Sequence, residues 1–141
     1  MVAAGHRVHA EEVRVSATSS GTETPIPLAA GHFARFSNAR PGQRWLTHPH
    51  GSEGWCGPGG NGVRFGGGNE GSFAVSRHPP GGRPSMYFMM RDDDVLTIAG
   101  PGRLFMTAHD NDRSDNQGEL VMLFEIFSGP PAAESASVEQ E

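Results

Sequence analysis

Short apolar segments that alternate with polar residues recur along this chain, separated by turns rich in glycine and proline. In residues 11–18 (EEVRVSAT), for example, Val13 and Val15 would lie on one face of a strand. Similar segments follow at spacings of about ten residues, and none shows the period of an amphipathic helix. They are residues 26–30, 32–39, 72–77, 86–90, 95–99, 104–108 and 120–126. This pattern predicts an all-β protein, built as an antiparallel β-sandwich or barrel.

The composition excludes several classes of function. The net charge is −5 and no basic cluster is present, so the electrostatic footprint of a nucleic-acid-binding protein is missing. All 11 basic residues are arginines, which excludes a P-loop lysine and a Schiff-base lysine. Cys56 is the only cysteine, so neither an intrachain disulfide nor a cysteine-based zinc site can form.

A length of 141 residues is typical of one domain. We expect a flexible lead-in over residues 1–10, a β-sandwich domain over residues 11–128 and a disordered acidic tail over residues 129–141. The chain has no run of about 18 apolar residues, so no membrane-spanning helix is predicted. The first residues lack the apolar core of a signal peptide, which leaves the cytoplasm and non-classical secretion as the expected locations.

A long glycine-rich stretch covers residues 41–71. No regular element is expected there, because ordered glycines cost extra backbone entropy. Trp45, Trp55 and Phe65 are spread through this stretch, which indicates that it is held in place. Such aromatic residues either anchor a loop in the core or offer a platform to a ligand such as a sugar ring.

A very polar connection, HDNDRSDNQG, joins the last two predicted strands. Gly118 can supply the positive φ that ends such a turn. The connection carries a dense set of side chains with hard oxygen donors, which are Asp110, Asn111, Asp112, Ser114, Asp115 and Asn116. Two interpretations remain open from the residues alone. The connection is either a Ca²⁺ loop between strands or a polar hairpin turn, because Asp and Asn also favour turns.

The connection is not an EF-hand. Counted from Asp110, position 6 is Asp115 and position 12 is Val121, whereas an EF-hand needs glycine and glutamate there. Ca²⁺ binds roughly six to eight oxygens, of which one loop of this size supplies about four or five. The others would come from a second loop or from a ligand, such as adjacent sugar hydroxyls.

The segment His48-Pro49-His50, followed by Glu53, offers a competing interpretation. It is close to the first motif of the cupins, which are metal enzymes on a jelly-roll barrel, although one residue is missing before the glutamate. A cupin-like metal-dependent enzyme would use His48, His50, Glu53 and His109. The simpler interpretation is that these are surface histidines in a loop.

Four ordered segments resemble the PA-IL-like lectins, which are Ca²⁺-dependent, galactophilic bacterial lectins with a galactose-binding-like β-sandwich fold. The last segment carries Gly102-Arg103-Leu104-Phe105-Met106, then His109-Asp110, then Asp115-Asn116-Gln117-Gly118. The three upstream segments are residues 17–36, residues 56–60 (CGPGG) and residues 71–75 (GSFAV). The resemblance covers roughly residues 11–128. The chain departs from the family at His109, where asparagine is usual.

The resemblance implies a Ca²⁺ ion between the last loop and an earlier one, with galactose hydroxyls completing the coordination. Asp110 and Asp115 would then be carboxylate ligands and Asn116 an amide ligand, with a backbone carbonyl from Asp112 or Arg113. A further carbonyl would come from residues 43–45. The ligand pocket would be shaped by four side chains, which are Trp45, Trp55, His48 and His50.

The expected function is therefore a Ca²⁺-dependent, galactoside-type lectin module and not an enzyme. Its partners would be carbohydrates, with no nucleic acid and no membrane. Affinity for single sugars is usually weak, so a homo-oligomer would gain from multivalency. Two alternatives stay open, the cupin-like enzyme and a structural module in which Ca²⁺ only staples the loop.

Overall fold

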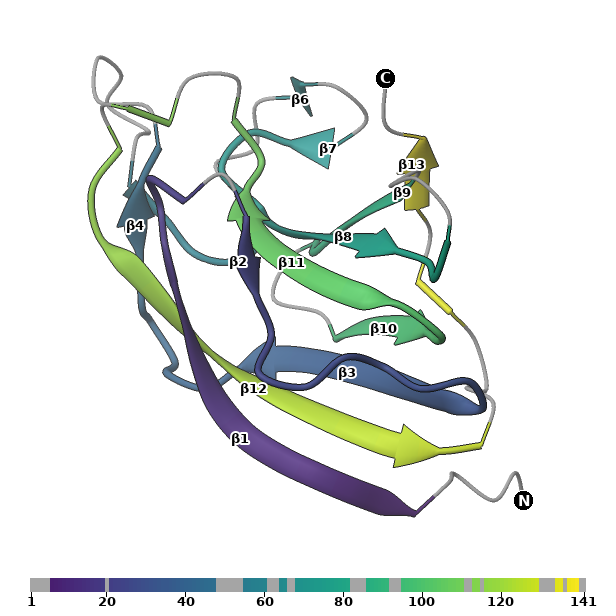
Figure 1. The fold of residues 1–141 in the computed structure, drawn as a ribbon. Helices are drawn as coiled ribbons and strands as arrows, with labels where there is room; N and C mark the ends of the chain where they lie inside the picture. Colours follow the sequence, from purple (N-terminus) through teal and green to yellow (C-terminus); the bar gives the residue numbers. More distant parts are fainter. Residues whose placement is uncertain are drawn as a thin grey trace.

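The computed structural model describes residues 6–19, 21–47, 55–60, 64–65, 68–81, 86–91, 95–110, 113–114, 116–129, 134–135 and 137–139. Their regular elements are all β-strands, arranged mainly in two antiparallel sheets that pack together (Figure 1). The predicted all-β sandwich is therefore confirmed. Among the described residues, no helix is long and apolar enough to cross a membrane.

The first sheet has four strands in the order β1 (Arg7–Ser16), β12 (Glu119–Ser128), β3 (His32–Asn38) and β10 (Leu96–Ala99). Successive side chains of a strand point to opposite sides of the sheet, so every second side chain faces the core and together these form the inner face. Val13 and Val15 are buried on β1 as predicted. On β12 the buried inner residues are Leu120, Met122, Phe124 and Ile126.

The second sheet has five strands in the order β13 (Ser137–Glu139), β9 (Met86–Met89), β8 (Phe73–His78), β11 (Arg103–Ala108) and β2 (Thr22–Glu23). The core lies between the two sheets. Phe36 of β3 contacts Phe73 of β8 with ring centroids 5.4 Å apart, and Phe124 of β12 at 5.2 Å. These aromatic rings join the two layers.

Two short ribbons lie in the stretch that was expected to have no regular element. They pair β4 (Trp45–Leu46) with β5 (Trp55–Cys56), and β6 (Arg64–Phe65) with β7 (Gly68–Asn69). Each strand is two residues long. A strand of that length has no period that a sequence pattern can reveal.

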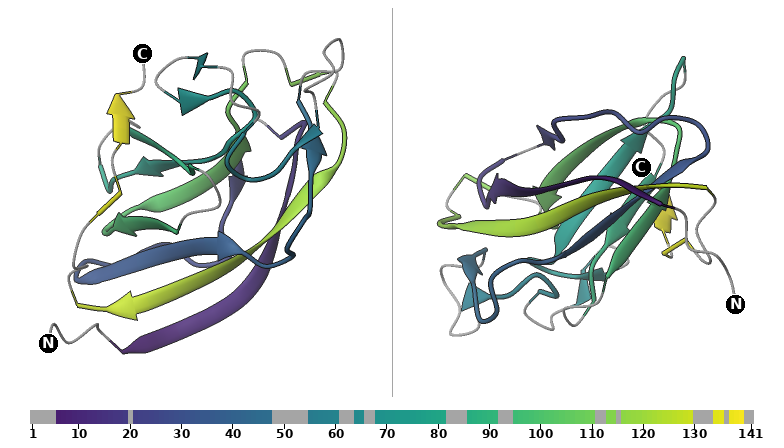
Figure 2. Two further views of the ribbon diagram at one scale, coloured as in Figure 1. Left: turned by 180° about the vertical axis from the view of Figure 1, so that it is seen from behind. Right: turned by 90° about the horizontal axis from the view of Figure 1, so that it is seen from below.

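Strands also occur within the predicted lead-in and tail. β1 begins at Arg7, which pairs with Phe127, so residues 7–10 belong to the first sheet. β13 pairs with β9, and the Ser135 backbone N–H donates a hydrogen bond to the Thr97 carbonyl on β10 at 2.9 Å. Figure 2 shows the C-terminal strand beside the second sheet from behind.

Candidate ion and ligand site at one end of the sandwich

The polar connection predicted between the last two strands lies between β11, which ends at Ala108, and β12, which begins at Glu119. It is at the end of the sandwich that is uppermost in Figure 1, near β4. Two of its four predicted ion ligands are described, and both are buried, with 6% of Asp110 and 5% of Asn116 exposed. Polar side chains in a surface turn are usually solvated, so the burial of these two favours a specific role.

Asn116 is held in one orientation by the protein. Its side-chain Nδ2 donates a hydrogen bond to the Ala17 carbonyl at 2.8 Å, and its backbone N–H donates to the Arg113 carbonyl at 3.2 Å. Its side-chain oxygen Oδ1 is buried and accepts no hydrogen bond from any described residue. A buried acceptor without a donor is rare in folded proteins and calls for a specific explanation.

Backbone hydrogen bonds fix the end of the connection on two sides. Leu46 and Gln117 exchange a pair of N–H···O bonds of 2.8 and 2.9 Å, which joins β4 to the connection. The Ala17 N–H donates to the Gly118 carbonyl at 2.9 Å, which joins the end of β1 to it. Gly118 has φ +88°, as the predicted turn requires.

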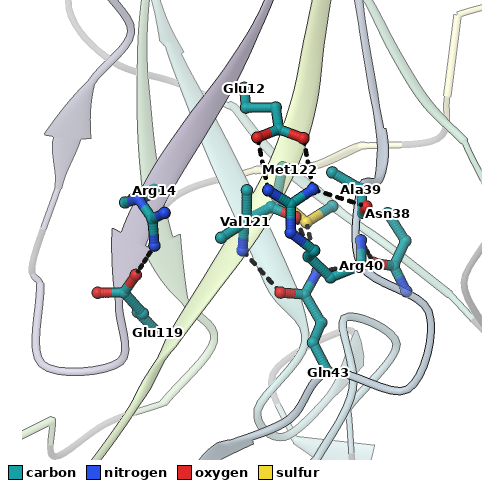
Figure 3. A network of polar contacts seen from close by, with 9 residues as sticks. All are labelled: Glu12, Arg14, Asn38, Ala39, Arg40, Gln43, Glu119, Val121 and Met122. Atoms are coloured by element: carbon teal, nitrogen blue, oxygen red, sulfur yellow. Dashed lines mark hydrogen bonds and ion pairs between the residues drawn. The ribbon is translucent and has the colours of Figure 1, made fainter.

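The Gln43 side chain braces the segment that leads into β4. Its Nε2 donates to the Val121 carbonyl at 2.8 Å, and its Oε1 accepts from the Val121 N–H at 2.7 Å (Figure 3). The same Nε2 donates to Asn38 Oδ1 at 2.6 Å. Residues 43–45 therefore lie beside the start of β12, the region from which a further carbonyl ligand was expected.

The two tryptophans have different positions. Trp45 has no exposed surface, and its Nε1–H donates to the Gly71 carbonyl at 2.7 Å. A side chain without exposed surface cannot contact a sugar, so Trp45 is a core anchor and not the ligand contact that was expected. Trp55 is 51% exposed, and its Cζ3 lies 3.5 Å from where a Cβ on Gly118 would be. It is therefore an exposed aromatic ring beside the polar connection.

A second turn meets the connection at His109. The Gly71 N–H donates to the His109 carbonyl at 2.8 Å, and the His109 N–H donates to the Ser72 carbonyl at 2.9 Å. Ser72 has no exposed surface, and its hydroxyl has no hydrogen-bond partner among the described residues. No sequence signal singles out Ser72, because serine is ordinary at the start of a strand.

The remaining predicted site residues lie outside the described residues. They are the ion ligands Asp112 and Asp115, and the ligand contacts His48 and His50, together with Glu53 of the cupin-like alternative. Within the described part of the chain, no group of three or more His, Cys, Asp or Glu side chains is placed to hold a metal ion. Asp110 and Asn116 are thus the described side chains of the expected ligand set.

Cys56 lies at the same end but is not exposed to reagents or substrates. It is buried, its Sγ lies 3.7 Å from Thr47 Oγ1, and burial raises the pKa of its thiol. A thiol with a raised pKa is a poor nucleophile at neutral pH. Cys56 is therefore a packing residue in this part of the structure.

We compared the chain with family models, with curated proteins and with solved structures, and none of them matches.

Proposed function

We propose that this protein is a Ca²⁺-dependent carbohydrate-binding module of the galactoside-binding lectin type. The observation that carries the proposal is the buried Asn116 Oδ1, which accepts no hydrogen bond from a described residue. It lies on the same short connection as the buried carboxylate of Asp110. A cation held by the connection would give this amide oxygen a partner.

The energetics favour an ion over a simple turn. Leaving a buried acceptor unsatisfied costs about 1–3 kcal/mol, and a turn of ordinary polar residues would avoid that cost by exposing the amide to water. Asn116 is instead fixed by its Nδ2 hydrogen bond to Ala17, with Oδ1 kept inside. Carboxylate and amide oxygens are the ligands of a hard cation, and Ca²⁺ is the ion that such sets prefer in proteins.

Three side chains would hold the ion, those of Asp110, Asp115 and Asn116, together with a backbone carbonyl of Asp112 or Arg113 from the same connection. Ca²⁺ accepts roughly six to eight oxygens, so such a loop leaves positions that vicinal sugar hydroxyls can fill. The bound ion would supply direct coordination of the sugar. The exposed ring of Trp55 beside Gly118 would pack against the apolar face of the same sugar.

Thermal unfolding with Ca²⁺ and with EDTA tests ion binding. Saturation at 100 times Kd should stabilise the fold by about 2.7 kcal/mol, seen as a higher Tm with Ca²⁺. Asp110→Asn, which removes one negative charge but keeps the shape, should abolish most of this increment. Glu119→Gln is the matched control, because Glu119 is exposed, lies outside the connection and pairs with Arg14. An identical Tm in Ca²⁺ and EDTA would contradict the proposal.

A glycan array probed with and without Ca²⁺ tests sugar binding. We expect retention on galactose-containing glycans with Ca²⁺, lost in EDTA and weakened in Trp55→Ala. If Ca²⁺ raises the Tm but no glycan is retained, the connection is a structural Ca²⁺ staple. If the isolated protein carries Fe, Mn or Zn that depends on His48 and His50, the cupin-like enzyme is the better description.

A further inference from the structure

Strand β1 forms one edge of the first sheet and runs for ten residues, Arg7–Ser16. Its backbone groups alternate between β12 and the open side. The Ala17 N–H donates to the Gly118 carbonyl, and the same register pairs Val15 with Leu120 and Val13 with Met122. In an antiparallel ladder the alternate residues direct their N–H and C=O groups the other way. Ala10, Glu12 and Arg14 therefore direct their backbone groups to the open edge.

The other edges of the two sheets are covered or short. On β10 the Thr97 N–H donates to Ser135 Oγ at 2.8 Å, and the Ala99 N–H donates to Glu134 Oε2 at 2.6 Å. The edge strands of the second sheet, β2 and β13, have two and three residues. Within the described residues, no hydrogen bond from outside the β1–β12 ladder reaches the backbone of Ala10, Glu12 or Arg14. Among the strands of the described residues, β1 is the last of its sheet on this side (Figure 1).

The charges on this edge are self-complementary. Val13 and Val15 point into the core, so Glu12 and Arg14 share the outer face, where their side chains are 47% and 67% exposed. Arg40 donates to both carboxylate oxygens of Glu12, at 2.5 and 2.7 Å, and Arg14 donates to Glu119 at 2.5 Å (Figure 3). A negative and a positive group thus stand two residues apart on the same face of the edge strand.

We propose that β1 pairs with β1 of a second copy of this chain, antiparallel, about a two-fold axis through Val13. Glu12 would then lie opposite the partner's Arg14, and Ala10 opposite the partner's Ser16. The residues that face the open edge would form the hydrogen-bonded pairs of the new ladder. Each outer face would carry a row of alternating charges, Arg40, Glu12, the partner's Arg14 and the partner's Glu119.

Charge selects this register over its neighbours. The two-fold axis can pass through another residue of β1 instead. The side chains that face the core then still lie on the same side of both copies, but each residue faces a different residue of the partner. Placing the axis at Glu12 would set two Glu12 side chains opposite each other, and placing it at Arg14 would do the same for two arginines. Like charges directly opposite each other destabilise strand pairs. Of these three axis positions, only Val13 brings opposite charges together, and it does so twice.

Charged residues on an edge strand also protect monomers from association. That protection works when the charged side chain repels an approaching strand, or when the approaching strand has no group of opposite charge to pair with it. Here Glu12 and Arg14 carry opposite signs on either side of Val13, so a second copy of the same strand is attracted in the antiparallel orientation. The strand pairing is a small interface, so we expect a dimer with a Kd of about micromolar order. Its affinity should fall as the salt concentration rises. The dimer is independent of the proposed Ca²⁺ and sugar site.

Sedimentation velocity over a concentration series tests the dimer with three variants. Glu12→Arg and Arg14→Glu should each weaken self-association by about tenfold or more, because each places like charges opposite each other. The double variant Glu12→Arg/Arg14→Glu should restore the dimer. An equimolar mixture of the two single variants should also form a dimer, since one chain then offers two positive and the other two negative groups. Melting curves check that each variant is folded, as exposed ion pairs contribute little stability.

Arg103→Glu is the matched control. It reverses a charge in an exposed ion pair, Arg103 with Glu23, which joins two strands of the second sheet. It should leave the dimer unchanged. A monomer at every concentration would overturn the proposal. So would a dimer that survives both single reversals, or single reversals whose loss is not recovered by the double variant or by the mixture.

Discussion

At the scale of single residues, Gly71 shows how tightly the end of the sandwich is packed. Its φ is +82°, and a Cβ at this position would lie 2.3 Å from Thr47 Oγ1 and 2.7 Å from Cys56 Sγ. Its carbonyl also accepts the Trp45 Nε1–H hydrogen bond. The residue therefore needs both the left-handed conformation and the absence of a side chain.

Replacing Gly71 with alanine should destabilise the protein by about 3 kcal/mol or more, since overpacking adds to backbone strain. The measurement is the free energy of unfolding from urea denaturation. Gly42→Ala is the control, because Gly42 has φ +81° but nothing within 4 Å of its Cβ position. It should cost about 1–2 kcal/mol from backbone strain alone. Equal costs at both positions would contradict the packing argument.

Sequence reasoning could predict that Trp45 and Trp55 matter, but not which role each has. Both stand among glycines and polar residues, and nothing local distinguishes them. Trp45 becomes an anchor because the Gly71 carbonyl lies within reach of its indole N–H, a contact between residues 26 positions apart. The polarity of Asp110 and Asn116 was evident in the sequence, but their burial was not. Asn116, for example, is held by a hydrogen bond to the Ala17 carbonyl, which lies 99 positions away in the sequence.

At the scale of elements, alternation was enough to predict most of the strands that border the core, and bounding turn signals predicted β3. β3, β8, β11 and β12 lie close to their predicted ranges. The start of β1 was missed because residues 7–10 carry no buried side chain that would mark one face. β13 and the short ribbons were missed because strands of two or three residues have no readable period.

The cover of the β10 edge leads to a prediction about the C-terminal segment. Truncation after residue 129 should remove the Ser135 and Glu134 hydrogen bonds to β10 and destabilise the fold by about 1–3 kcal/mol. Hydrogen exchange at the Thr97 and Ala99 amides should become faster, because both donate to this segment.

Truncation after residue 136 is the control for that experiment. It retains Glu134 and Ser135 but removes β13. The Thr97 and Ala99 amides should then stay protected. If both truncations expose these amides to the same extent, the cover depends on the pairing of β13 with β9 and not on the two covering residues.

At the scale of the whole molecule, β12 holds the first sheet together by pairing with β1 on one side and β3 on the other. Arg7 thus pairs with Phe127, nearly the full length of the domain away in sequence. The class of the fold followed from local patterns, whereas this strand order did not. Pairing between distant strands depends on loop closure and on the fit of the two layers, which a local pattern does not contain.

Cys56 reports how often the end of the sandwich opens. It is buried, and burial raises the pKa of its thiol, so modification of the native protein should be slow at neutral pH and should require opening. We expect labelling to be much faster in urea. If the proposed Ca²⁺ site is correct, saturating Ca²⁺ should slow native labelling by up to about a hundredfold at 100 times Kd. Equal labelling rates in native buffer and in urea would contradict the burial.

The contrasting positions of Trp45 and Trp55 give the protein two separable fluorescent reporters at one end. The buried indole of Trp45 should emit at shorter wavelength and resist aqueous quenchers, whereas the half-exposed ring of Trp55 should emit at longer wavelength and be quenched readily. Unfolding would remove the short-wavelength emission of Trp45. Binding of a ligand beside the polar connection would shift the emission of Trp55 alone. One emission spectrum can therefore distinguish a folded protein that binds from one that has lost its structure.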